Sequence, residues 1–134
     1  MSASRRLVRA TVTAAAALVG LATTACIGPF ESCDDVGNFG VQITVVDSVT
    51  GRPPLGLAVL VATEGTYTES AQASLQVSNG TLIVAAAHER PGTYSLRVTM
   101  TGYHAWTASG VRVSESGRCD NVDTVKLTAR LQPI

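Results

Sequence analysis

The chain has 134 residues, of which 46% are hydrophobic, and it carries 10 basic and 10 acidic side chains. Three of the basic residues, Arg5, Arg6 and Arg9, lie near the N-terminus, so the rest of the chain has seven basic against ten acidic residues. This mildly acidic remainder contains no Lys/Arg cluster, which argues against nucleic acid as a partner. Its length is that of one domain.

The N-terminal segment has the three zones of an export signal. The basic residues precede the apolar stretch 10–21, and small residues follow at 22–25. The apolar stretch is too short and too rich in Ala, Thr and Gly for a membrane span, which needs about 20 strongly apolar residues. We therefore expect cleavage. The predicted organisation is a signal peptide at 1–25, an anchor and short linker at 26–37, and a folded domain at 38–134.

Cys26 is the predicted lipidation site. Ala25 and Thr24 precede it, and the segment resembles a bacterial lipoprotein signal, although Thr23 stands where such signals usually carry Leu. The resemblance implies an exported protein of the bacterial cell envelope. A lipid would anchor it to a membrane, on the periplasmic or the outer surface of that membrane. The alternative is ordinary cleavage near Ala25, which leaves Cys26 as a free thiol or paired elsewhere.

Two further cysteines, Cys33 and Cys119, are expected to form a disulfide, because export delivers them to an oxidising compartment. Such a bridge would gather four acidic residues, Asp34, Asp35, Asp120 and Asp123. Calcium uses carboxylates of this kind, but the sequence has no EF-hand-like spacing, so we favour a solvated acidic patch over a calcium site. No cofactor is expected.

A period of two dominates the remainder and indicates half-buried strands. Apolar and polar residues alternate over 39–47, 94–100 and 125–131, whereas the segment 57–63 is apolar on both faces and suits the interior of a sheet. A short strand is expected at 111–113.

Turn residues separate these strands. Asn79-Gly80 predicts a hairpin between SLQV and TLIVAA, because both positions accept positive φ. The segment 85–90 is expected to form a short helical turn that Pro91-Gly92 ends. About seven short strands without a long helix predict an all-β fold, an antiparallel Greek-key β-sandwich.

Two segments, VVDSVTGRPPLGLAVLV and PGTYSLRVTMTGYHAW, carry a resemblance to the carboxypeptidase regulatory-like, or transthyretin-like (prealbumin-like), family of small β-sandwiches. The family pattern is a strand that ends in Asp, a Thr-Gly-x-Pro turn, a Gly-led apolar strand, Pro-Gly-x-Tyr, an alternating strand and Gly-Tyr. The matching residues are Asp47, Thr50, Gly51, Pro53, Gly56, Pro91, Gly92, Tyr94, Gly102 and Tyr103. The family's usual Thr-Asp-x-x-Gly is missing, and SNGTLIVAAAHER stands in its place.

The resemblance implies a non-catalytic binding or structural module whose partner is an envelope protein or glycan. One enzymatic branch of the transthyretin-like fold ends in Tyr-Arg-Gly-Ser, whereas this chain ends in Leu-Gln-Pro-Ile. The residues themselves agree, because no nucleophile elbow, phosphate loop, HExxH or CxxC is present and the histidines, His88 and His104, stand sixteen residues apart. The alternative is a small-ligand carrier or hydrolase that uses the end loops of the sandwich.

The motif GYHAWT gathers Tyr103, His104 and Trp106 into one candidate binding surface, because exposed aromatic clusters bind sugars, peptides or proteins. We favour the alternative in which Tyr103 and Trp106 cap the core, since aromatic side chains are mostly buried.

Overall fold

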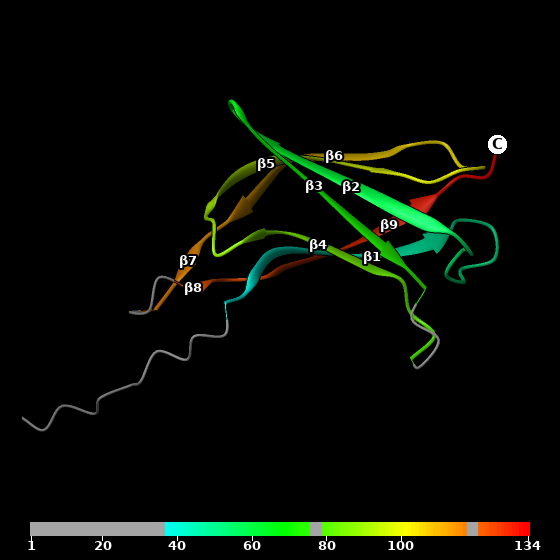
Figure 1. Cartoon of the computed structure of the whole chain (residues 1–134), viewed down its shortest axis with the longest axis horizontal. Helices are drawn as coiled ribbons and strands as arrows, with labels where there is room; N and C mark the ends of the chain where they lie inside the picture. The colour runs from blue at the N-terminus through cyan, green and yellow to red at the C-terminus, as the bar shows by residue number, and fades with distance from the viewer. Residues whose placement is uncertain (1–36, 76–78, 118–120) are drawn as a thin grey trace, which may run out of the picture. The chain divides into compact units, whose positions relative to one another are not determined.

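The computed structural model describes residues 37–75, 79–117 and 121–134, which form an all-β domain with two main sheets (Figure 1). The sheets have the strand orders β4-β1-β9 and β3-β2-β5-β6, and β7 and β8 form a small separate pair. The strands are β1 (Phe39–Asp47), β2 (Leu57–Glu64), β3 (Tyr67–Ser74), β4 (Ile83–His88), β5 (Gly92–Thr99), β6 (Trp106–Val113), β7 (Glu115–Ser116), β8 (Asn121–Val122) and β9 (Val125–Leu131).

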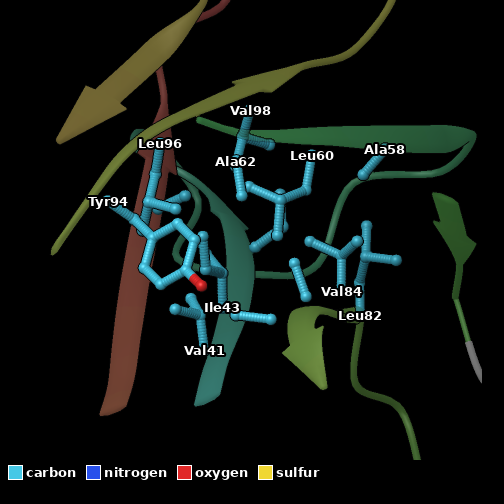
Figure 2. Packing of buried hydrophobic residues seen from close by; sticks show 14 of the residues in the cluster. Val41, Ile43, Ala58, Leu60, Ala62, Leu82, Val84, Tyr94, Leu96 and Val98 are labelled. Atoms are coloured by element: carbon cyan, nitrogen blue, oxygen red, sulfur yellow. The ribbon is translucent and has the colours of Figure 1, made fainter. Parts of the chain in front are cut away.

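Alternation along the strands builds the core between the two sheets. Figure 2 shows Leu60, Leu96 and Val98 of the four-stranded sheet facing Val41 and Ile43 of β1. All five side chains are at most 2% exposed. The predicted alternation over 39–47, 94–100 and 125–131 is confirmed in these strands, except that Phe39 remains 40% exposed.

Tyr94 is the largest fully buried side chain of the core. Its hydroxyl donates to the carbonyl oxygen of Arg90 at 3.0 Å, so the polar end of the ring has a partner. Burial is the main reason that the pKa of Tyr94 is raised above its ordinary value. The interior strand predicted at 57–63 is confirmed, because β2 lies between β3 and β5.

The strand count and direction differ from the expectation of about seven antiparallel strands. The described residues contain nine strands, and β9 runs parallel to β1, from the Val41–Val125 pair to the Asp47–Leu131 pair. The chain returns to the beginning of β1 before β9 starts, and there the hydroxyl of Thr124 donates to the carbonyl oxygen of Phe39 at 2.8 Å. This return makes the last two strands of that sheet parallel.

The hairpin predicted at Asn79-Gly80 falls partly on residues 76–78, which lie outside the described ranges. A turn is present there, with the Thr81 N–H donating to Asn79 Oδ1 at 3.2 Å, but β3 and β4 belong to different sheets. The hairpin partner of β3 is β2, joined by the two-residue loop Gly65-Thr66. Gly65 has φ +54°, as a hairpin turn with glycine at its first central position requires.

The helical turn predicted at 85–90 is wrong, because β4 continues to His88. Alanines favour a helix locally, but pairing with β1 and burial of Ala86 and Ala87 favour the strand. The strand then ends in an unusual backbone, with φ +57° at Ala87 and +50° at Glu89. The β-strand at 111–113 is the last part of a longer one, β6.

Candidate functional site

The three residues of the predicted aromatic surface have different surroundings. Tyr103 and Trp106 are half-buried and pack against the hydrophobic core, whereas His104 is exposed. The Tyr103 hydroxyl donates to Asp47 Oδ2 at 2.9 Å. Two of the three aromatic groups therefore have structural contacts, and His104 is the one that solvent reaches freely.

Asp47 is the centre of a hydrogen-bonded cluster at this end of the domain. Its Oδ1 accepts hydrogen bonds from the N–H groups of Val49 and Thr50, each at 2.8 Å, and its Oδ2 accepts from Tyr103. These hydrogen bonds, that from Thr50 first, hold the pKa of Asp47 below its ordinary value against the opposing effect of burial. The same hydrogen bond to the carboxylate raises the pKa of Tyr103. The ionised carboxylate thus joins two loops that are far apart in the sequence.

Backbone hydrogen bonds tie the C-terminal segment to the same end, where the C-terminus and the β1–β2 loop appear together in Figure 1. The Ser48 N–H donates to the carbonyl oxygen of Leu131 at 2.9 Å, and the His104 N–H donates to that of Gln132 at 2.8 Å. Val49, Leu55 and Ile134 are exposed apolar residues on these segments. The loops at this end are therefore held in place by the main chain and by Asp47.

A second polar network lies at the opposite end of the sandwich. Arg90 contacts Glu64 at 3.6 Å and lies 3.9 Å from the centre of the Tyr67 ring. Glu69 Oε2 accepts from the Tyr67 hydroxyl at 3.0 Å and from the Ala87 N–H at 2.8 Å, so it links β3 to β4 across the two sheets. Burial is the main cause of the raised pKa of Tyr67, and Glu69 adds to it. The sequence analysis did not single out any of these four side chains.

The two histidines do not share a site. His88 ends β4 beside the start of β1, where its ring lies 5.0 Å from that of Phe39 in an edge-on arrangement. His104 lies at the other end, beside the C-terminal segment. The part of the chain that the structure describes contains no group of three or more His, Cys, Asp or Glu side chains suited to a metal ion.

Several predicted residues lie outside the described ranges. They are the signal peptide and the residues Cys26, Cys33, Asp34, Asp35, Cys119 and Asp120. Asp123 is described and exposed, and its N–H donates to the carbonyl oxygen of Ser114 at 2.9 Å. The lipid anchor, the disulfide and the acidic cluster therefore remain predictions. In the described ranges, no helix has the length and apolar character that crossing a membrane demands.

The described surface has two notable hollows. One, of about 360 Å³, lies on the outer face of β2, β5 and β6 and is lined by Val61, Thr63, Ser95, Arg97, Thr107 and Ser109 among others. The other, of about 640 Å³, is more open and polar, and includes Glu64, Arg112 and Glu115 in its lining. The sequence analysis treated Ser95 and Arg97 only as the polar face of a strand, and nothing in their spacing distinguishes them from such a face.

No family model matches this chain, and no curated protein is significantly similar to it. The structure defines an all-β domain of two sheets with a sandwich-like arrangement, and it identifies no family.

Proposed function

We propose that this protein is an exported lipoprotein of the bacterial cell envelope whose single sandwich domain is a non-catalytic binding or structural module. Lipid on Cys26 holds the protein to a membrane, and the domain belongs to the carboxypeptidase regulatory-like group with its Greek-key topology. The domain binds an envelope protein or a glycan. Anchor and module are separate parts of this proposal, since they involve different segments of the chain.

One observation carries the module assignment. Asp47 and Tyr103 come from the two separate segments that resemble the carboxypeptidase regulatory-like pattern, and their side chains meet at 2.9 Å. Thr50, also in that pattern, donates its N–H to the same carboxylate. These residues hold loops together, which is a structural role and supports a scaffold better than a catalytic centre.

The anchor is tested by replacing Cys26. Wild-type protein, expressed in a bacterium that processes lipoproteins, is expected to partition into detergent and to gain a mass consistent with more than one acyl chain, because a single chain binds membranes only marginally. Cys26→Ser is expected to stay soluble or uncleaved. Cys33→Ser serves as the matched control and is expected to keep the lipid. Soluble wild-type protein that begins at another residue contradicts the anchor.

The module is tested by using the lipid-anchored protein as bait in native envelope extracts. We expect a defined envelope protein or glycan to be enriched over a bait lacking the sandwich domain. Turnover of an ester, amide or glycoside by the purified protein, lost on substitution of a single loop residue, would instead establish a hydrolase and contradict the proposal.

A further inference from the structure

The hollow on the outer face of the four-stranded sheet coincides with a break in its hydrogen-bond ladder. Tyr94 pairs with Val111 and Leu96 pairs with Ala108, so two residues of β6, Ser109 and Gly110, face one residue of β5. Gly110 has φ +69°, a conformation that a side chain would strain. This arrangement is a β-bulge, which bends its strand and redirects the neighbouring side chains. The bulge therefore explains why an otherwise regular sheet face is hollowed here.

The lining of the hollow has one charge. Among the described residues that line the hollow, Arg97 is the only charged one, and it stands between Val61 of β2 and Thr107 of β6 in the register of the sheet. Among the residues that the structure describes, the ion pair is the one between Arg90 and Glu64, and Arg97 takes no part in it. An exposed guanidinium without a carboxylate beside it is positioned to bind an anion from solution.

The neighbours of Arg97 narrow the chemistry of that anion. The lining contributes hydroxyl groups that donate or accept hydrogen bonds, on Ser95, Thr107 and Ser109, and Val61 contributes an apolar surface. The Thr63 hydroxyl donates to the carbonyl oxygen of Ser95 at 3.3 Å and offers a ligand only its acceptor lone pairs. A guanidinium matches the two oxygens of a carboxylate with two parallel hydrogen bonds. The volume of about 360 Å³ is at the small end of the range for small-molecule sites, roughly 300–1,000 Å³.

We propose that this hollow binds a small organic acid, with the carboxylate on Arg97, its polar groups on the surrounding hydroxyls and its carbon body against Val61. The inference rests on the proposal that the domain is a binding module, and it adds the class of ligand and the residues that recognise it. It is independent of the anchor on Cys26. The carboxylate can belong to a sugar acid or to an acylated amino acid, and the probes below distinguish these sources.

The test is a titration of the isotope-labelled protein, processed by its host and purified in mild detergent, followed by backbone amide shifts in NMR spectra. The probes are two matched pairs, glucuronate with glucose and N-acetylalanine with its neutral amide. We expect at least one acid to shift the amides of β5 and β6 around Arg97, while its uncharged counterpart does not. The pair that responds identifies the source of the carboxylate.

Substitution of Arg97 sharpens the test. Arg97→Gln is expected to weaken binding about tenfold or more, because hydrogen bonds to charged groups contribute roughly 1.5–3 kcal/mol. Arg97→Lys is expected to bind with an affinity between those of the wild type and Arg97→Gln, since it keeps the charge but loses the pair of parallel hydrogen bonds. Arg130→Gln makes the same charge change on the other sheet and is expected to bind as wild type. Thermal unfolding of each variant verifies that it is folded.

Two results would overturn the inference. One is an equal response to an acid and its neutral counterpart, or no response to either acid. The other is unchanged affinity in folded Arg97→Gln. Neither result touches the module assignment, which the enrichment of an envelope partner by the intact bait tests separately.

Discussion

The two ends of the sandwich are held by polar contacts of different kinds. At the end where β1 finishes, one carboxylate, that of Asp47, accepts three hydrogen bonds from two loops. At the other end there are two carboxylates. Glu64 forms an ion pair with Arg90, Glu69 accepts a hydrogen bond from Tyr67, and Arg90 stacks on the Tyr67 ring. At the first end the side-chain hydrogen bonds converge on the carboxylate of Asp47, beside the backbone hydrogen bonds of Ser48 and His104. At the second end the contacts are distributed over β2, β3 and the β4–β5 connection.

This difference teaches what each end tolerates. A carboxylate with three donors is the sole acceptor for all of them, so its removal leaves several groups without a partner at once. In the distributed network, each loss leaves other contacts in place, such as the position of Arg90 over the Tyr67 ring. The second end also contains left-handed backbone at Ala87 and Glu89, a conformation that costs L-residues free energy.

The largest expected effect comes from comparing Asp47→Ala with Glu69→Ala. Asp47→Ala is expected to lower the melting temperature by several degrees, because both turn N–H groups and the Tyr103 hydroxyl lose their acceptor. Glu69→Ala is expected to lower the melting temperature by less, because mainly the N–H of buried Ala87 loses its acceptor. Thermal and urea unfolding, monitored by circular dichroism, measure both changes.

Conservative variants control this comparison. Asp47→Asn keeps an acceptor oxygen for the turn and is expected to recover part of the loss, and Glu69→Gln does the same for Ala87. Equal melting temperatures for Asp47→Ala and the wild type would mean that the hydrogen bonds to Asp47 contribute nothing to stability.

An intermediate effect is expected from pH. The pKa of Asp47 is lowered below its ordinary value of 3.8 in the folded protein, so its contribution to stability is present above that value and is lost as the pH falls through the folded pKa. The pKa of Tyr103 is raised above 10.0, so its contribution is present below pH 10 and is lost as the pH rises through the raised pKa. Melting temperatures measured across both ranges should decline at each extreme.

Tyr103→Phe separates the two limbs of this pH dependence. The variant is expected to lose the alkaline decline that comes from Tyr103 and to retain an acid decline from the hydrogen bonds of Asp47 to Val49 and Thr50. If its alkaline profile matches that of the wild type, the decline belongs to other tyrosines.

The smallest expected effect has the opposite sign and concerns the second end. Glu89→Gly is expected to stabilise the domain by about 0.5–1 kcal/mol, because glycine adopts φ +50° without the steric cost of a Cβ and the side chain of Glu89 is exposed. Glu89→Ala keeps the Cβ and serves as the control without a gain. A destabilised Glu89→Gly variant would show that the entropy cost of glycine exceeds the relief of strain.

Sequence reasoning predicted the parts of the fold that depend on local alternation. The strands around Ile43, Leu96 and Leu127 follow from a period of two, and the buried side chains fall on the expected face. It missed β3. The segment YTESAQAS is polar, and its inner face is only half-buried, so its composition does not indicate a strand; pairing with β2 makes it one. It also misjudged the alanines of β4, where pairing with β1 outweighs helix propensity.

The candidate sites divide in the same way. The Asp47 turn belongs to a local motif, so the sequence pattern alone identifies Asp47 and Thr50. The contact of Glu69 with β4 and the hollow around Arg97 depend on which strands become neighbours and where a bulge falls. Such information is absent from the spacing of residues along one strand.

The parallel pairing of β1 with β9 has a mechanical consequence. Chain entry at Phe39 and the chain end at Ile134 lie at opposite ends of the same two strands, which share seven paired positions. A force that pulls these two points apart acts along the strands. It therefore loads the backbone hydrogen bonds between β1 and β9 together instead of breaking them one after another. A domain tethered at its N-terminal side and loaded at its C-terminal side therefore resists extension in shear, the stiff direction of a sheet.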